Sequence, residues 1–434
     1  MHNKYLLSVF QNKKFQEKVH SILIKTERKE NKKISSKELS FRLNIGQQYI
    51  SDIEERRRKP AKELLNDIYK ALDVIFDDDL SIVKKTEGKF EEFLEYYFLN
   101  DDNQKDVIKS IVNDNSLRYS YAFGIVLICD YINNYFIFKT KEIDFNEKKL
   151  SNNILYLLND MDPVYHSVFY LFKGRYYYQK NDVDKAKENY LIALEHASTY
   201  SNELMDGLKG CIYHNYGFLL ARENKLYEAE DQLKKALSYL KSQNYIRRII
   251  HAENTLSLVY MNLHQYQMAS AQHKKTLRLI KQANQPRYYA MIYSNIATLS
   301  FVQGNYEACI NDSIKALEYD DEYNPLYYFL SWSYYKLGDI ENCRKYYNIL
   351  NQIDLSDDEF TRKFTEMIAL YLEKASTADI FKHLREFYNY TRKNEIINYQ
   401  IDVLKLLIDF CKENEKHKYL SEYQQILLEL YEKM

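Results

Sequence analysis

The sequence predicts an all-α fold, in which a small N-terminal domain is followed by a long array of paired helices. Two features of composition predict helix. The 434 residues include only 9 Gly and 4 Pro, far fewer than the turns of β-sheet folds use. They also include 43 Tyr and 21 Phe, large side chains that fill the gaps between stacked helices. The third observation is a phrase that recurs between about residues 165 and 354, which is typical of helical repeats.

Charge separates a basic head from an acidic body. Hydrophobic residues make up 46% of the chain and charged residues 28%, which is ordinary for a globular protein. The length allows more than one domain. Residues 1–60 hold 15 Lys and Arg against 7 Asp and Glu, whereas the remainder holds 46 against 55. We therefore expect only the head to meet a polyanion.

The head begins with two predicted helices. Apolar residues spaced for one helix face mark the first helix, at Phe15, Val19, Ile22 and Leu23. Ser35 and Glu38 form an S-x-x-E capping box, so we expect the second helix to start at about Ser36. Leu39 and Leu43 form the core face of this second helix.

A short turn and two further helices complete the head. Asn44 ends the second helix, Ile45 fills the core, and a third helix begins near Gly46 or Gln47 with Ile50 and Ile53 facing inward. A fourth helix follows Pro60, with apolar residues Leu64, Leu65, Ile68 and Leu72. Two short helices joined by a turn of three or four residues form a helix-turn-helix.

The stretch ISSKELSFRLNIGQQYISDIEERRRKP resembles the λ-repressor-like (XRE) DNA-binding domain, in which a Glu, a basic run and a Pro follow the helix-turn-helix. Glu54 and residues 57–60 stand at the matching positions. Ser40 stands where the family usually has Ala, and it is small enough to keep the helices packed. Arg56 stands where the family usually has Gly, and it costs free energy if the bend after the third helix needs a positive φ.

The resemblance implies that the third helix enters the major groove with its N-terminal residues at the base edges. By position these residues are Gln47, Gln48, Tyr49, Ser51 and Asp52. Gln47 and Gln48 are the best readout candidates, since a glutamine amide can bind adenine through two hydrogen bonds. Asp52 repels phosphate unless it faces a cytosine amino group or an Arg. We expect phosphate contacts from Ser36, Lys37, Arg57, Arg58 and Lys59.

Five units of the tail share small residues at fixed offsets. The residue that opens each second helix is small, with spacings of 43, 40, 40 and 34 residues: Ala186, Ala229, Ala269, Cys309 and Cys343. Twelve residues earlier stand Gly174, Gly217, Ser257, Ala297 and Ser331, which let two helices lie close together. Aromatic residues recur four positions before these, at Tyr170, Tyr213, Tyr293 and Tyr327. The units resemble tetratricopeptide (TPR) repeats, which predicts a right-handed α-solenoid.

These patterns define the expected domains. We expect a helix-turn-helix domain over residues 1–76, a linker over 77–88 and degenerate helical repeats over 89–164. Five TPR-like repeats follow over 165–354. Residues 355–434 are expected to contain about four more helices, of which the last caps the array.

An XRE-type head followed by TPR-like units resembles the peptide-sensing regulators of Gram-positive bacteria and their phages. This is the RRNPP group of Rgg, Rap, NprR, PlcR and PrgX, and the arbitrium receptors of phages are similar. The resemblance implies a cytoplasmic homodimer that binds double-stranded DNA through its head. It also implies that a short imported peptide binds in the concave face of the solenoid and changes DNA binding.

Members of that group use Asn side chains on the inner helices to bond the peptide backbone, which presents both donors and acceptors. Asn215 and Asn295 stand two residues before the small position of their repeats, and Asn254 stands three before it. Asn262 lies further along the same helix as Asn254. The other candidates are His214, which could face the groove, and Arg247, Arg248 and Arg287, which could bind a carboxylate. For each Asn, the alternative is a polar residue on an exposed helix face.

The sequence carries no enzyme signature, and we expect no catalytic residue, cofactor or metal site. The histidines among the repeats lack metal-ligand spacing. Cys129, Cys211, Cys309, Cys343 and Cys411 are scattered, which predicts reduced, buried thiols in a cytoplasmic protein. The N-terminus lacks the apolar segment of a secretory signal. The apolar stretch from Tyr121 to Phe138 contains polar residues, which predicts a buried helix rather than a membrane span.

Two alternatives to a peptide-responsive DNA-binding regulator stay open. In the first, the tail binds and sequesters a partner protein, and DNA binding is secondary or lost. In the second, the head binds DNA but the ligand of the tail is not a peptide. The sequence leaves undetermined the operator, the peptide and whether the protein activates or represses transcription.

Overall fold

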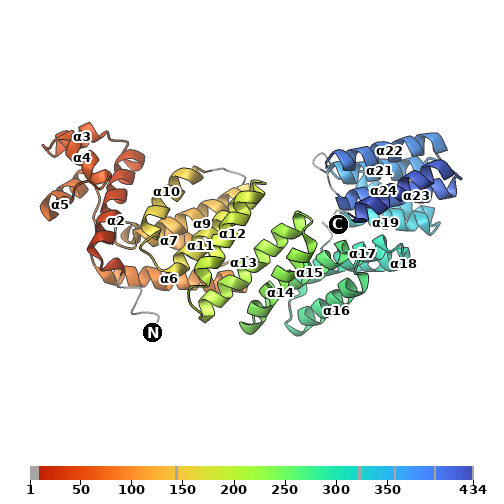
Figure 1. Cartoon of the computed structure of the whole chain (residues 1–434), viewed down its shortest axis with the longest axis horizontal. Helices are drawn as coiled ribbons and strands as arrows, with labels where there is room; N and C mark the ends of the chain where they lie inside the picture. The colour runs from red at the N-terminus through yellow and green to blue at the C-terminus, as the bar shows by residue number, and fades with distance from the viewer. Residues whose placement is uncertain (1–8, 142–144, 321–324, 356–357, 395–396, 433–434) are drawn as a thin grey trace. The chain divides into compact units, whose positions relative to one another are not determined.

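The computed structural model describes residues 9–141, 145–320, 325–355, 358–394 and 397–432 (Figure 1). These residues form helices throughout, apart from an isolated bridge between Asp77 and Ser120, so the predicted all-α fold is confirmed. The helices of the first half are α2 (Lys13–Thr26), the π-helical turn η1 (Glu27–Asn31), α3 (Ser36–Arg42), α4 (Gln47–Glu54), α5 (Lys62–Ala71), α6 (Leu80–Leu99), α7 (Gln104–Val112), α8 (Asn115–Arg118), α9 (Phe123–Lys141) and α10 (Glu147–Leu158).

The remaining helices come in pairs. They are α11 (Pro163–Gln179) with α12 (Val183–Ala197), α13 (Glu203–Arg222) with α14 (Leu226–Ser242), α15 (Ile246–Asn262) with α16 (Tyr266–Gln282), α17 (Tyr289–Val302) with α18 (Tyr306–Leu317), α19 (Pro325–Lys336) with α20 (Ile340–Leu350), α21 (Glu359–Leu372) with α22 (Thr377–Lys393), and α23 (Ile397–Glu413) with α24 (His417–Glu432). The chain divides into two compact units, one of residues 1–219 and 238–248 and the other of residues 220–237 and 249–434.

The head has the predicted helix-turn-helix. Ser35 caps α3, since its hydroxyl accepts a hydrogen bond of 3.0 Å from the backbone N–H of Glu38. The third helix, α4, begins at Gln47 as predicted, and it buries Ile50 and Ile53 against the core. In Figure 1, α3, α4 and α5 gather into one small group in the red part of the chain.

A buried ion pair fastens α4 to the first part of the head. Arg28 in η1 donates two parallel hydrogen bonds to the Glu54 carboxylate, with N···O distances of 2.5 and 2.8 Å. A third Arg28 nitrogen donates to the carbonyl of Ile34 at 2.6 Å. Both charged side chains are about 5–6% exposed. Parallel bonds between a guanidinium and a carboxylate fix orientation as well as distance, so this pair holds the end of α4 in register.

The repeats are built on the predicted small residues. Each of the five anchors is the fourth residue of the second helix in its pair, and each is fully buried: Ala186, Ala229, Ala269, Cys309 and Cys343. Gly174 in α11 lies against α12, because a Cβ added there would be 2.6 Å from the ring of Tyr190 and 3.2 Å from the carbonyl oxygen of Ala186. In α19, the hydroxyl of Ser331 donates to the carbonyl of Cys343 in α20 at 3.0 Å. Small residues at this column therefore allow close helix contact.

The same tight turn joins the two helices of all seven pairs. One residue of each turn has a positive φ between 52° and 79°: Asn181, Asn224, His264, Gly304, Gly338, Lys374 and Glu415. This left-handed residue ends the first helix and reverses the chain. The turns after α21 and α23 show that the paired pattern continues beyond the five repeats that the sequence predicts. The four helices predicted for residues 355–434 are α21 to α24.

The segment predicted as a linker is mostly helical. Residues 80–88 form the first turns of α6. Asp79 caps this helix, since its carboxylate accepts a hydrogen bond from the backbone N–H of Ser81. The apolar stretch before residue 138 forms the buried helix α9, as predicted. All five cysteines are buried and free, also as predicted. Among the described helices, none combines the length and the apolar character that crossing a membrane requires.

Candidate nucleic-acid interface and peptide site

The predicted reading residues lie on the outer face of α4. Ile50 and Ile53 face the core, which turns Gln47 and Gln48 outward, and both glutamines are exposed. Tyr49, Ser51 and Asp52 are half-buried. The N-terminal turn of α4 is thus the part of the helix with the most accessible amide groups, which is the end that a helix-turn-helix presents to base edges.

Asp52 binds two neighbouring side chains on this face. Its carboxylate oxygen Oδ1 accepts a hydrogen bond of 2.8 Å from the Gln48 amide and one of 3.0 Å from Nε of Arg57. Arg57 also forms an ion pair of 2.7 Å with Glu55. The sequence left open whether Asp52 meets an Arg, and the structure places Arg57 beside it. A base-edge contact by Gln48 therefore competes with Asp52 for the same amide group.

The predicted phosphate-binding residues surround α4. Ser36, at the start of α3, accepts a hydrogen bond of 3.1 Å from the amide nitrogen of Gln47, and Lys37 is exposed next to it. The Arg58 guanidinium lies 4.0 Å from the centre of the Tyr49 ring. Lys59 forms an ion pair of 2.5 Å with Glu17 of α2. The structure therefore brings Ser36 and Gln47 together, whereas Lys59 is paired within the head.

Arg56 takes the strained position that the sequence identified. Its φ is +65°, the left-handed conformation for which the XRE family usually has Gly. Its guanidinium carbon lies 3.1 Å from the centre of the Tyr156 ring of α10, so Arg56 joins the head to the segment that follows it. Lys18 of α2 lies 4.6 Å from the same ring and forms an ion pair with Asp160. Sequence reasoning missed Tyr156, because a partner 100 residues away leaves no local signal.

Two of the predicted peptide residues meet in the second unit. The Asn295 amide nitrogen in α17 donates a hydrogen bond of 2.6 Å to the Asn254 carbonyl oxygen in α15. Asn254 is 8% exposed and Asn295 is half-buried. Within the described residues, this contact leaves the Asn254 nitrogen and the Asn295 oxygen without another hydrogen bond. Asn262 is half-buried at the C-terminal end of α15.

The other predicted peptide residues are engaged or lie apart from this pair. Asn215, in the first unit, donates to the carbonyl of Cys211 one turn earlier at 2.7 Å, and His214 beside it is half-buried. Arg248 is buried in the first turn of α15, where its Nε donates to the Tyr97 carbonyl at 3.1 Å. Two predicted residues remain. Arg247 forms an ion pair of 3.4 Å with Asp101. Arg287 is exposed and donates a hydrogen bond of 2.8 Å to the Tyr288 hydroxyl.

Sequence reasoning also missed a cavity of about 640 Å³ in the second unit. It lies between the turn that follows α17 and the helices α23 and α24, and Trp332, Asp402 and Tyr431 are among its lining residues. Burial raises the pKa of Asp402 to about 6. None of the predicted peptide residues lines this cavity. One side of it is formed by α23 and α24, a pair without the small-residue pattern, so the repeat pattern in the sequence does not indicate the cavity.

Comparison with known proteins identifies the head and the fold. Residues 24–77 match the helix-turn-helix family model. A comparison with curated protein sequences finds no match. A Rap protein complexed with competence and sporulation factor is 13% identical with a TM-score of 0.61, covering 81% of this chain and 98% of Rap. The apo form of the quorum sensor NprR from B. thuringiensis is 14% identical with a TM-score of 0.60, covering 80% of this chain and 99% of NprR.

A third solved structure has the same fold. Aspartyl phosphate phosphatase F from Bacillus subtilis is 13% identical with a TM-score of 0.56, and the match covers 82% of this chain and 95% of the phosphatase. At these identities the likeness concerns the fold. The chain thus carries a helix-turn-helix domain at residues 24–77 and shares its fold with Rap and NprR, which confirms at the level of fold the resemblance to peptide-sensing regulators that the sequence predicts.

Proposed function

We propose that this protein is a cytoplasmic, non-enzymatic transcriptional regulator that binds operator DNA as a homodimer and responds to a short peptide bound by its helical repeats. The observation that carries the proposal is the N-terminal turn of α4. It presents the exposed amides of Gln47 and Gln48 on a helix fixed from behind by two buried isoleucines and an ion pair. Basic residues around this turn supply the charge that phosphate contacts need.

Contacts to bases and contacts to phosphates affect DNA affinity in different ways. A glutamine that bonds a base edge discriminates between sequences by about 1–3 kcal/mol, whereas a cation near phosphate adds affinity for every sequence. The Gln48 amide is held by Asp52 at 2.8 Å in the free protein, so it exchanges that bond for one to the base. The Arg57 guanidinium remains beside Asp52 and keeps that carboxylate from facing phosphate uncompensated.

Replacing both Gln47 and Gln48 with Ala is expected to reduce discrimination between the duplex upstream of the protein's own gene and an unrelated duplex by about 10- to 100-fold. Replacing Arg57 and Arg58 with Ala is expected to weaken both duplexes alike and to lower the slope of log affinity against log salt by about 1–2. Gel shifts with the full-length protein at several salt concentrations measure both effects.

Lys109→Ala on α7 serves as the control, because Lys109 is exposed and lies outside the head. We expect this variant to shift both duplexes as the unaltered protein does. If the two double variants change DNA binding in the same way, or if neither changes it, the assignment of α4 as the reading helix is wrong.

The peptide proposal rests on the Asn254–Asn295 pair and on what the similar proteins bind. The Rap structure contains competence and sporulation factor, and NprR is described as a quorum sensor. In this chain, the pair leaves one amide nitrogen to donate and one carbonyl oxygen to accept, which is the combination that a peptide backbone requires. We propose that Asn254 and Asn295 bind the peptide backbone, and that Asn262, on the same helix as Asn254, extends this contact.

Isothermal titration with short synthetic peptides encoded by small open reading frames next to the gene tests the site. Asn254→Ala and Asn295→Ala are each expected to weaken peptide binding about tenfold, which corresponds to one lost hydrogen bond of about 1.4 kcal/mol. Asn311→Ala on α18 is the matched control, because Asn311 is exposed on the second helix of the same repeat as Asn295. Equal heats from all three variants would remove the pair from the proposed site.

A second candidate function is sequestration of a partner protein by the repeats. The fold is also that of an aspartyl phosphate phosphatase, and the Gln48 and Arg57 side chains are already engaged by Asp52 in the free head. This function predicts that the full-length protein shifts no duplex containing its own upstream region, even at low salt. The gel shift described above therefore separates the two candidates.

A further inference from the structure

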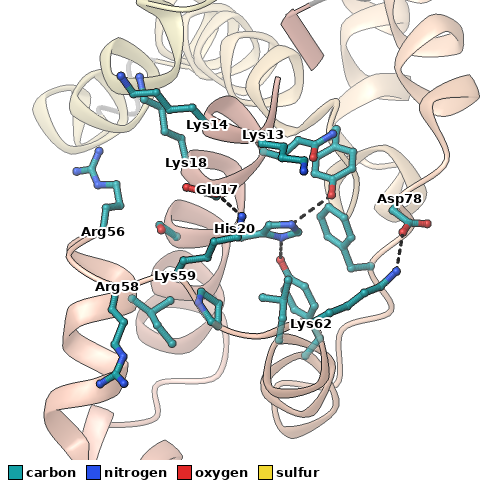
Figure 2. A pocket seen from close by; sticks show the side chains of 18 of the residues that line it. Lys13, Lys14, Glu17, Lys18, His20, Arg56, Arg58, Lys59, Lys62 and Asp78 are labelled. Carbon is teal, nitrogen blue, oxygen red and sulfur yellow. Dashed lines mark hydrogen bonds and ion pairs between the residues drawn. The ribbon is translucent and has the colours of Figure 1, made fainter. Parts of the chain in front are cut away.

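A cavity of about 610 Å³ lies in the first unit, where the head meets the segment that follows it (Figure 2). Residues of α2, of the turn from Arg56 to Lys62 and of α5 line its head side. Tyr121 and Tyr156 line the other side. This volume suits a ligand of a few tens of atoms, because small-molecule pockets measure about 300–1,000 Å³. Neither the reading face of α4 nor the Asn pair belongs to it.

The rim of this cavity is strongly basic. Seven cationic side chains line it, against the two carboxylates of Glu17 and Asp78: Lys13, Lys14, Lys18, Arg56, Arg58, Lys59 and Lys62. Lys59 pairs with Glu17 at 2.5 Å and Lys62 with Asp78 at 3.7 Å, so these four charges largely cancel (Figure 2).

Positive charge remains after this pairing. Lys18 pairs with Asp160, which lies outside the lining residues. Lys13 and Lys14 are exposed, and in the described part of the chain neither has an ion-pair partner. Arg56 is held by the face of Tyr156, which keeps its charge. Arg58 lies against the ring of Tyr49, and among the described residues it has no ion-pair partner. Four cations of uncompensated charge around one cavity favour an anion that bears more than one negative charge.

One wall of the cavity is aromatic and uncharged. The rings of Tyr69 and Phe76 are parallel within 3° with centres 5.1 Å apart, and Tyr121 meets Phe76 edge-on at 5.1 Å. His20 lies between them, with its Nδ1 2.6 Å from the Tyr69 hydroxyl and its Nε2 3.4 Å from the Tyr121 hydroxyl. Burial lowers the pKa of His20 to about 4, so this wall stays neutral near pH 7. Aromatic rings such as Phe76 and Tyr121, both half-buried, attract a planar ring by stacking.

We propose that this cavity binds a nucleotide, with its phosphates on Lys13, Lys14 and Arg56 and its base against Phe76 and Tyr121. The two parts of such a ligand match the two surfaces, since phosphate oxygens accept charge-assisted hydrogen bonds and a base offers a flat face. The bound ligand touches the head and the segment that follows it at once. The cavity is thus a second effector site, distinct from the reading face of α4 and from the proposed peptide site, and it shares Arg58 and Lys59 with the predicted phosphate contacts.

Isothermal titration of the full-length protein with ATP, pyrophosphate and adenosine tests the proposal. We expect ATP to bind most tightly, pyrophosphate less tightly and adenosine least, because only ATP engages both the cations and the aromatic wall. The double variant Lys13→Ala with Lys14→Ala is expected to weaken ATP binding about tenfold or more, and Arg56→Gly is expected to do the same. Lys37→Ala, an exposed lysine of the head outside the cavity, is expected to bind ATP as the unaltered protein does.

Arg56→Gly guards against a folding artefact. Glycine adopts a φ of +65° without strain, so this variant removes the cation and is not expected to lose stability through its backbone. Tm measured without ligand checks this, and the unaltered protein is expected to show a higher Tm when ATP is added. If Arg56→Gly lowers the ligand-free Tm, the lysine double variant on exposed positions still decides the result.

The phosphates could instead belong to DNA, and competition distinguishes the two sources. Nucleotide binding at a separate site leaves the heat of ATP unchanged when a saturating duplex is present, and the lysine double variant retains its gel shift. Full displacement of ATP by duplex, together with a weakened gel shift of the lysine variant, would assign the cavity to the DNA backbone and overturn the proposal. The proposal would also be overturned if neither ATP nor pyrophosphate gave heat, or if Lys37→Ala lost as much ATP affinity as the lysine double variant.

Discussion

Replacing Arg28 with Ala is expected to unfold the helix-turn-helix while the second unit stays folded. The Glu54 carboxylate, about 6% exposed, would lose both guanidinium bonds and remain as a buried, unpaired charge. Removing one partner of a buried ion pair costs about 3–5 kcal/mol, which is a large part of what a small domain has. The reading helix ends at Glu54, so DNA binding is expected to disappear with the fold of the head.

Hydrogen exchange of residues 36–54 measures this loss, and we expect exchange about 100-fold faster or more. Trp332, which is the only Trp and is buried in α19, reports by fluorescence that the second unit remains folded. Arg42→Ala is the matched control, because Arg42 pairs with Glu38 at the surface and such pairs contribute little. Restored protection in a protein carrying both Arg28→Met and Glu54→Leu would confirm that the unpaired charge is the cause.

The head shows what sequence could and could not predict. Capping at Ser35 and the inward isoleucines of α4 follow from local spacing, and the structure contains both. The resemblance to the XRE family pointed to Glu54, but nothing local pointed to Arg28. Arg28 lies 26 residues earlier in a π-helical turn, and a pairing across the domain has no period to detect. The contact of Arg56 with Tyr156 escaped for the same reason.

The helix pairs fall into two groups, which differ in the size of the side chains where the two helices meet. Five pairs carry small residues at the two close-contact columns, which the sequence revealed. The pair α21–α22 has Ile368 and Ile380 at the corresponding places, both buried, and α23–α24 has Ile408 and Leu420. Their turns use Lys374 and Glu415 in the left-handed conformation, where sequence leads one to expect Gly or Asn. These two later pairs keep the same tight turn between their helices but have larger side chains at the two columns. A search for small residues therefore could not detect that their helices are paired.

The site residues were predictable only where exposure follows from helix periodicity. Gln47 and Gln48 are exposed because Ile50 and Ile53 must be buried. By contrast, Arg248 was proposed as a peptide contact from its place near a helix start, and its guanidinium instead donates to the C-terminal turn of α6. Cations stabilise that end of a helix, so this contact has a structural reason of its own. The peptide role of Arg248 stays a prediction that requires this bond to exchange.

Adding a single methyl group at Gly174 is expected to destabilise the first unit by about 1–3 kcal/mol. The new Cβ of Gly174→Ala would lie 2.6 Å and 2.7 Å from two ring carbons of Tyr190, whose side chain is buried. It would also lie 3.2 Å from the carbonyl oxygen of Ala186, which belongs to the backbone of α12. The helix propensity gained, about 1 kcal/mol, is smaller than the cost of moving α11 away from α12.

The same substitution at Gly88 is expected to change the free energy of unfolding in the opposite direction. Gly88 lies inside α6 and is exposed, and a Cβ there has no atom within 4 Å. Gly88→Ala is therefore expected to stabilise the protein by about 0.5–1 kcal/mol through the lower entropy of the unfolded chain. Urea unfolding followed by circular dichroism compares the two variants in one unit of one protein. Since both replace Gly by Ala within a helix, a difference in sign isolates the contact with Tyr190, whereas equal shifts would show that α11 and α12 can separate without cost.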